Sequence, residues 1–286
     1  MHVSHLNSSI VLISVAGLLF LTSIFSVSIQ VSAYSPSAPI QARPDSQVVI
    51  RIDGSSASGS FTCPTISGAD SSSCSTNWSG YADTPSLGQV NAVSGSWKLP
   101  TLSCPNRGTT YVALWVGIDG YASSTVEQTG VLGECNRGAA SYSTWYEFYP
   151  NPMVTIKSVA VKPGNIVSAS VTYSSSTNKF SVKITNTNTG ASFSVAQTVS
   201  GAARSSAEWI VERPATCIGT LCRLTTLANF GSPSFTASST TIGTSAGAIT
   251  SSADVAITMV GSSTGPILAE PSALSNGGAS FTVSYH

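Results

Sequence analysis

Short runs of apolar residues, separated by Gly, Asn, Pro and Ser, follow one another along the chain from about residue 77 onward. They span residues 93–99, 111–118, 144–149, 167–173, 179–185, 207–211, 253–260 and 280–285. Apolar and polar positions alternate clearly in SVKITNT and FTVSY, and no segment sustains the helical apolar period of about 3.6 residues. Many short strands without intervening helices predict an all-β fold, either an antiparallel sandwich or a barrel.

The beginning of the chain has a different pattern. Residues 10–27 form a long apolar run, and Val31, Ser32 and Ala33 follow as a small-residue cleavage site. This pattern predicts a secretory signal peptide over residues 1–33, and the alternative is an uncleaved membrane anchor. Residues 34–75 are rich in Ser, Pro and Gly and are interpreted as a pro-segment or linker. Residues 76–286 then form the β domain.

Six cysteines agree with export, because an even number without metal-type spacing in an exported chain indicates disulfides. They are Cys63, Cys74, Cys104, Cys135, Cys217 and Cys222. Six cysteines permit 15 pairings. Proximity along the chain favours Cys63–Cys74 and Cys217–Cys222, which leaves Cys104–Cys135, but the sequence alone does not prove this connectivity.

Composition and charge exclude several classes of function. Only 8% of residues are charged, and 12 basic side chains balance 12 acidic ones, so no basic surface for nucleic acid is expected. So few charges suit a secreted protein that works in acid, because little self-repulsion develops on protonation. The three histidines are His2, His5 and His286. Ser-His-Asp, Cys-His and histidine-zinc sites are therefore not available in the domain.

Five segments, in order, carry most of the aromatic and acidic residues. They read NWSGY at 77–81, ALWVGIDG at 113–120, VEQTG at 126–130, TWYEFYP at 144–150 and AEWIVE at 207–212. Together they resemble the motifs of the glutamic peptidases, or eqolisins. The resemblance covers residues 77–223, about half of the chain. It includes the small loop closed by Cys217 and Cys222, which matches a disulfide of that family.

The resemblance implies a fold, a catalytic pair and a substrate class. The family's fold is a lectin-like (concanavalin-type) sandwich of two curved antiparallel sheets, with the active pair on the concave face. The QTG motif assigns the catalytic glutamine to Gln128, and the end of AEWIVE assigns the catalytic glutamate to Glu212. The implied enzyme is a secreted, pepstatin-insensitive acid endopeptidase that acts on proteins or peptides without a cofactor or metal. A monomer is expected, with no contact to the membrane once the signal peptide is removed.

The chemistry of this pair suits amide hydrolysis in acid. An ionised Glu212 can take a proton from water and later return it to the leaving nitrogen, and the Gln128 amide can donate to the developing oxyanion at any pH. In an extended strand, Glu208 and Glu212 share one face and lie about 13 Å apart, too far to act together. Only the resemblance selects Glu212 over Glu208.

Five further residues are candidates for the substrate cleft or for contacts around the catalytic pair. Trp78, Trp115 and Trp145 correspond to cleft tryptophans of the family, although ordinary sheet packing is the alternative for each. Asp119 and Glu147 are expected either to hydrogen-bond around the pair or to cap loops at the sandwich edge. Glu127 alternates away from Gln128, so its carboxylate is expected to be solvated.

The chain departs from the family pattern at three positions. Leu132 and Ser143 stand where acidic residues are usual, and Phe148 stands where Trp is usual, which affects the expected pH optimum and specificity. Two functions other than peptide hydrolysis are also compatible with the sequence. One is a lectin-like module that binds carbohydrate or another surface without catalysis. The other is a glycoside hydrolase using Glu147 and Glu212, which requires carboxylates about 5 to 9.5 Å apart.

Overall fold

The structure is a computed structural model that describes residues 48–49, 63–218, 221–249 and 253–286. The expected signal peptide lies outside the described residues, as do residues 34–47 and 50–62 of the expected pro-segment or linker. Within the described ranges the chain forms strands and short 3-10 turns but no α-helix, and none of its helices is long and apolar enough to cross a membrane. The all-β prediction is confirmed.

The strands are β1 (Val48–Val49), β2 (Ser71–Ser75), β3 (Trp78–Asp83), β4 (Val90–Lys98), β5 (Thr109–Ile118), β6 (Val126–Asn136), β7 (Ala139–Tyr149), β8 (Val154–Ile156), β9 (Ile166–Ser174), β10 (Lys179–Asn186), β11 (Ser192–Gln197), β12 (Ala207–Glu212), β13 (Ala215–Ile218), β14 (Leu221–Leu224), β15 (Ser234–Ile242), β16 (Ser245–Gly247), β17 (Asp254–Val260), β18 (Ile267–Pro271) and β19 (Phe281–Tyr285). The 3-10 turn η2 spans Asn276–Gly278. All eight apolar runs singled out in the sequence lie on strands.

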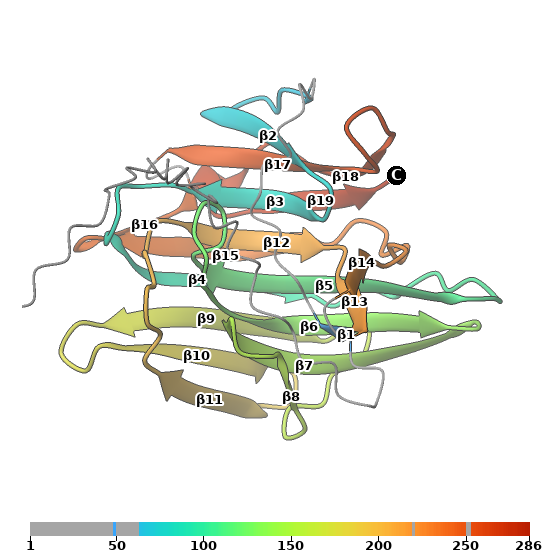
Figure 1. The fold of residues 1–286 in the computed structure, drawn as a ribbon, viewed down its shortest axis with the longest axis horizontal. Coiled ribbons are helices and arrows are strands. Elements are labelled where there is room, and N and C mark those ends of the chain that lie inside the picture. Colours follow the sequence, from blue (N-terminus) through green and yellow to red (C-terminus); the bar gives the residue numbers. More distant parts are fainter. Residues whose placement is uncertain (1–47, 50–62, 219–220, 250–252) are drawn as a thin grey trace, which may run out of the picture. The chain divides into compact units, whose positions relative to one another are not determined.

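Sixteen strands form one hydrogen-bonded sheet, shown in Figure 1. Their order is β11-β10-β9-β4-β15-β19-β18-β17-β3-β12-β5-β6-β7-β8, with β16 beside β15 and β2 beside β17. Strand β19 joins the two halves, because it pairs with β15 on one side and β18 on the other. Strands β4, β9 and β10 of one half contact β5, β6 and β12 of the other, so the sheet folds back on itself as a sandwich. A separate small sheet contains β1, β13 and β14.

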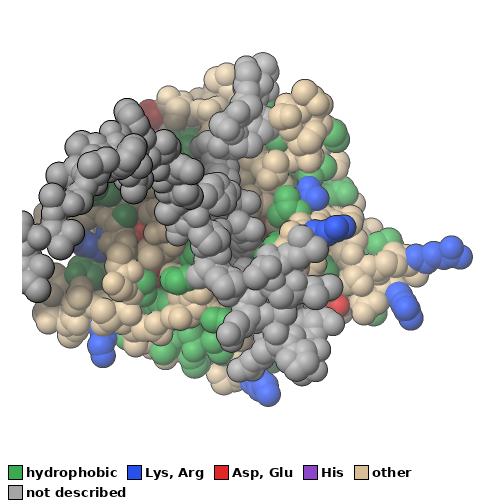
Figure 2. Space-filling model, viewed as in Figure 1, with side chains coloured by type: hydrophobic (Ala, Val, Ile, Leu, Met, Phe, Trp, Pro, Cys, Tyr) green, Lys and Arg blue, Asp and Glu red, His purple; other side chains and the backbone are tan. Residues whose placement is uncertain are grey.

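The main core lies between these two halves. Its largest fully buried side chains include Trp97, Trp209, Phe235 and Phe281. The Trp209 indole nitrogen donates to the carbonyl of Ser94 across the two halves at 2.7 Å, which satisfies its polar atom inside the core. Charged side chains are few on the face shown in Figure 2, as the composition leads one to expect.

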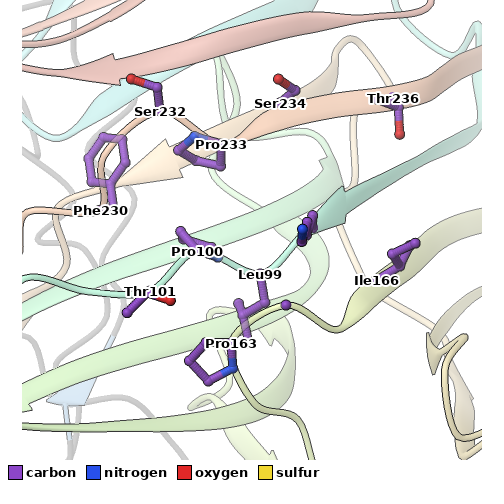
Figure 3. A pocket seen from close by; sticks show the side chains of 12 residues that line it. Leu99, Pro100, Thr101, Pro163, Ile166, Phe230, Ser232, Pro233, Ser234 and Thr236 are labelled. Atoms are coloured by element: carbon purple, nitrogen blue, oxygen red, sulfur yellow. The ribbon is translucent and has the colours of Figure 1, made fainter.

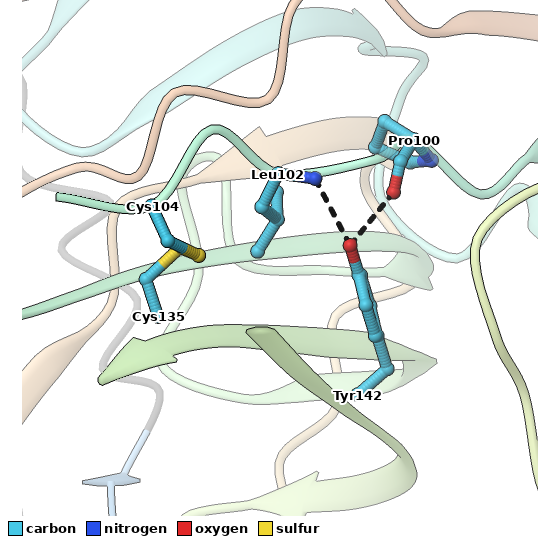
Figure 4. The surroundings of a disulfide bond; sticks show 5 residues. All are labelled: Pro100, Leu102, Cys104, Cys135 and Tyr142. Atoms are coloured by element: carbon cyan, nitrogen blue, oxygen red, sulfur yellow. Dashed lines mark hydrogen bonds between the residues drawn. A yellow bond between two sulfur atoms is a disulfide. The ribbon is translucent and has the colours of Figure 1, made fainter. Parts of the chain in front are cut away.

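Three disulfides connect the described cysteines, and the pairs are those that proximity favours: Cys63–Cys74, Cys104–Cys135 and Cys217–Cys222. Cys104 lies in the loop that leads into β5, and Cys135 lies on β6. Beside this bridge, the Tyr142 hydroxyl of β7 donates to the carbonyl of Pro100 and accepts from the amide of Leu102 (Figure 4). The loop is therefore fixed to both β6 and β7.

Candidate active site

Strand β12 brings the AEWIVE segment into the centre of the sheet. It lies between β3 and β5, although about 90 to 130 residues separate it from them in the sequence (Figure 1). Residues paired directly across antiparallel strands point to the same face of the sheet. The register therefore shows which side chains share a face with Glu208, Ile210 and Glu212.

One row of residues crosses five strands on this face. Glu208 pairs with Ala82 of β3 and with Gly117 of β5. Gly117 in turn pairs with Gln128 of β6, and Gln128 pairs with Glu147 of β7. Across these five strands the row thus contains a glutamine and two glutamates, together with Ala82 and Gly117.

The next row carries the tryptophans. Ile210 pairs with Trp115, Trp115 with Gly130, and Gly130 with Trp145. A Cβ atom at Gly130 would overlap the carbonyl oxygen of Leu114 and lie 2.6 Å from the Cβ of Trp115, so only glycine fits against β5 at this position. This close approach explains the glycine of the QTG motif. Trp78 packs edge-on against Trp115, with ring centroids 5.1 Å apart.

Glu212 lies one row further, paired with Trp78 and Ala113. Its Oε2 accepts a hydrogen bond of 2.9 Å from the indole nitrogen of Trp115, and its side chain is fully buried. Burial raises the pKa of the Glu212 carboxyl well above its usual range, the Trp115 hydrogen bond lowers it, and the nearby Glu147 carboxylate raises it. The Asn77 and Trp78 side chains also lower this pKa by hydrogen bonding. Glu212 is therefore a desolvated carboxyl with one oxygen fixed by the Trp115 indole and with further donors beside it.

Gln128 and Glu147 form a direct pair on the same face. The Gln128 Nε2 donates to the Glu147 Oε2 over 2.6 Å, which fixes the amide and leaves its second N–H available. Burial raises the pKa of Glu147 to about 8, and its hydrogen bond from Gln128 opposes the shift. Glu147 is therefore close to both candidate catalytic side chains, since it bonds Gln128 and acts electrostatically on Glu212.

The remaining acidic candidates lie at one end of these strands. Asp119, in the left-handed conformation with φ of 70°, accepts hydrogen bonds from the backbone amides of Arg204 and Ser205 at 2.7 and 2.9 Å. It therefore fixes the loop that leads into β12. Glu127 does alternate away from Gln128, but the expectation that it is solvated is wrong. It is fully buried against Ile118 and Phe148, and burial raises its pKa to about 9.

The sequence did not predict that Gly117 lies between Glu208 and Gln128. It also did not predict that Glu208 lies in the same cross-strand row as Gln128 and Glu147. The residues next to Gly117 in the sequence do not show whether this glycine lies within a strand or in a turn. Register across β12, β5 and β6 depends on strands far apart in the sequence, so only the tertiary structure reveals this row.

A groove elsewhere in the described chain does not share this chemistry. A groove of about 680 Å³ between the ends of β4, β9 and β15 is lined mainly by apolar residues and hydroxyls, with Lys98 as its charged residue (Figure 3). None of the candidate site residues lines it. No group of three or more His, Cys, Asp or Glu among the described residues is arranged to hold a metal ion.

Comparison with known proteins agrees with the motifs. The model of the peptidase A4 family matches residues 76–285. Aspergillopepsin-2 of Aspergillus niger is 31% identical over 203 residues, which cover 62% of this chain and 68% of that protein.

Two solved structures share the fold. A scytalido-glutamic peptidase with a peptide-based transition state analog superposes with a TM-score of 0.63 and 25% identity, over 74% of this chain and 98% of that one. Aspergilloglutamic peptidase from Aspergillus niger gives a TM-score of 0.52 and 30% identity, over 62% and 99%. The chain belongs to the peptidase A4 family and is a glutamic-type endopeptidase.

Proposed function

We propose that this chain hydrolyses peptide bonds in acid with Glu212 as general base and acid and Gln128 as the oxyanion donor. The observation that carries this assignment is the cluster around Glu147, which hydrogen-bonds Gln128 at 2.6 Å and lies close enough to Glu212 to raise its pKa. Family membership favours this reaction over a sugar-binding module or a glycoside hydrolase.

The steps follow from the contacts of the two side chains. The Oε1 atom of Glu212 is buried and forms no hydrogen bond of regular geometry with a described residue, although the Asn77 and Trp78 side chains lower the pKa of this carboxyl by hydrogen bonding. We expect a water molecule to bind at this atom. Glu212 in its ionised form takes a proton as this water attacks the carbonyl carbon. The second N–H of Gln128 then donates to the oxyanion, because its first N–H is held by Glu147. Glu212 returns the proton to the leaving nitrogen.

Substrate and water must also change the environment of Glu212. In the structure its side chain is closed off from solvent, which favours the neutral acid. Water admitted with the substrate solvates the carboxylate, and the Trp115 N–H favours the same ionised form. We therefore expect the ionised fraction to rise when the site opens, which permits base catalysis at acid pH.

The working environment follows from the same proposal. Three disulfides fit an extracellular protein, and we infer that the chain is secreted and acts as a monomer. The mechanism contains no aspartate pair, so we expect pepstatin, an inhibitor of aspartic peptidases, to have no effect.

The test is cleavage of a denatured protein between pH 2 and 7 with pepstatin present, using the full chain after incubation in acid. We expect activity in acid only, a loss of about 10²- to 10³-fold in kcat for Gln128→Ala, and at least as large a loss for Glu212→Gln. Glu270→Gln, at a partly exposed position on β18, is the matched control and should retain activity. Retention of activity by folded Glu212→Gln would refute the assignment.

A further inference from the structure

Glu208 is a buried carboxyl for which the proposed mechanism has no use. Its side chain is fully buried and shares a sheet face with Gln128, because both residues pair with Gly117 of β5. Neither of its carboxylate oxygens forms a hydrogen bond of regular geometry within the described part of the chain. The Ser206 hydroxyl and the Tyr121 amide do act on this carboxyl. A buried carboxyl without a hydrogen bond of regular geometry is nevertheless costly, so its retention points to a further bound partner.

The residues beside Glu208 are unusually small. Ala82 is its neighbour on β3 and Gly117 is its neighbour on β5. The Trp115 ring lies over Gly117, where an added Cβ would be 2.9 Å from the ring atom Cζ3. The low part of the sheet surface, which permits the close approach of another main chain, is therefore on the Ala82 side of Glu208. The surroundings of Glu208 therefore favour contact with a peptide backbone over contact with a long side chain.

The ionisation of Glu208 indicates the chemistry of that contact. Burial raises the pKa of its carboxyl well above the usual range, and the Asp119 and Glu127 carboxyls raise it further. The Ser206 hydroxyl and the Tyr121 amide act in the opposite direction. In acid the carboxyl is neutral and offers both a donor and an acceptor, which complements the C=O and N–H of an amide.

The distance from Glu208 to the catalytic pair limits which residue of a bound peptide Glu208 can contact. Glu208 is two strands from Gln128, about 10 Å, and four residues from Glu212 along β12, about 13 Å. The scissile bond must lie between Gln128 and Glu212. An extended peptide rises about 3.3 Å per residue, so Glu208 reaches main chain two to four residues away from that bond.

We propose that Glu208 is a substrate-binding residue that hydrogen-bonds a backbone amide of the bound peptide two to four residues from the scissile bond. The proposal rests on the assignment of Glu212 and Gln128 as the catalytic pair.

The experiment is a double-mutant cycle. It tests whether the effect of methylating one substrate amide on kcat/KM depends on the presence of Glu208. A peptide that the wild type cleaves at one bond is prepared with one N-methyl group at a time, at each amide two to four residues to either side of that bond. In the wild type, we expect one of these methylations to lower kcat/KM about 5- to 150-fold. In Glu208→Met, kcat/KM of the parent peptide should be lower, and the same methylation should have no further effect.

Two other variants separate binding from folding. Glu208→Gln keeps a neutral donor and acceptor, so it should restore much of the sensitivity to that methylation. Glu270→Gln, on β18 and outside the electrostatic surroundings of Glu208, should behave as the wild type does. If Glu208→Met does not fold, the same coupling is measured in Glu208→Ala.

Two results would overturn the proposal. One is that no methylation in this range affects the wild type. The other is that Glu208→Met or Glu208→Ala remains as sensitive to methylation as the wild type, with equal losses for all peptides, which would mean a purely structural role. Glu212→Gln is assayed on the same parent peptide, so a failure of the catalytic assignment is observed separately.

Discussion

Trp115 connects the parts of the site at the scale of single residues. Its indole nitrogen donates to Glu212, and its ring lies beside Gly117, where an added Cβ would be 2.9 Å from the ring atom Cζ3. Trp78 packs against the same ring. One side chain thus binds the proposed base and fills the space next to the row that contains Gln128.

Replacing Trp115 by Phe should shift the pH dependence of activity. The substitution keeps an aromatic ring but removes the N–H that favours the ionised form of Glu212, so the pKa of that carboxyl should rise. A hydrogen bond to a charged group contributes about 1.5 to 3 kcal/mol, equivalent to about one to two pH units. The acidic limb of kcat/KM against pH should therefore move upward. An unchanged limb in the folded variant would mean that Glu212 does not act as the ionised base.

At the scale of elements, β5, β6 and β7 carry Trp115, Gln128 and Glu147, and their relative positions are fixed from outside the site. The Cys104–Cys135 bridge joins the loop before β5 to β6, and Tyr142 of β7 hydrogen-bonds the same loop (Figure 4). This arrangement ties three neighbouring strands at the end opposite Asp119.

Removing the Cys104–Cys135 bridge should destabilise the protein more than removing Cys217–Cys222. The first closes a separation of 31 residues and the second a separation of 5. Chain entropy predicts losses of about 3.7 and about 2 kcal/mol in the free energy of unfolding. Denaturant unfolding of the double alanine variants at acid pH measures both. Equal losses, or a larger loss for Cys217–Cys222, would contradict the entropic account.

At the scale of the whole molecule, acidic side chains are few but many of them are buried. Asp83 is fully buried beside Asp254 and Asp70, and burial followed by these neighbours raises its pKa to about 8. Burial likewise raises the pKa of Glu127 to about 9 and of Glu147 to about 8. Within the described residues, the contact between oppositely charged groups is His286 with Glu270 at 3.9 Å, so none of these buried carboxyls gains an ion pair.

The folded protein should therefore be most stable in acid. Between the usual carboxyl pKa of about 4 and the raised values of about 8 to 9, the folded state holds protons that the unfolded state has lost. Stability must then fall as pH rises through this window. Thermal unfolding at pH 3, 5 and 7 should show a decreasing Tm, and Asp83→Asn should reduce the decrease. A Tm that increases over this range would contradict the assignment of buried neutral carboxyls.

Local sequence patterns are sufficient to predict the fold class, eight of the strands and the motifs that mark the family. These features depend on the alternation of neighbouring residues and on short segments such as QTG and AEWIVE, which are local. Strand β6 escaped detection because Gly130 and Gly133 interrupt its pattern, and the packing of Trp115 that requires Gly130 is not visible locally.

Which residues lie side by side depends on contacts between distant strands, and the three-dimensional structure is needed to see them. It inserted β12 between β3 and β5, paired Gln128 with Glu147, buried Glu127 and aligned Glu208 with Gln128. Alternation tells which face a side chain takes within its own strand, but a partner on another strand depends on strand order and register. Those are set by how the two halves of the sheet bury their apolar faces together, which involves residues far apart in the chain.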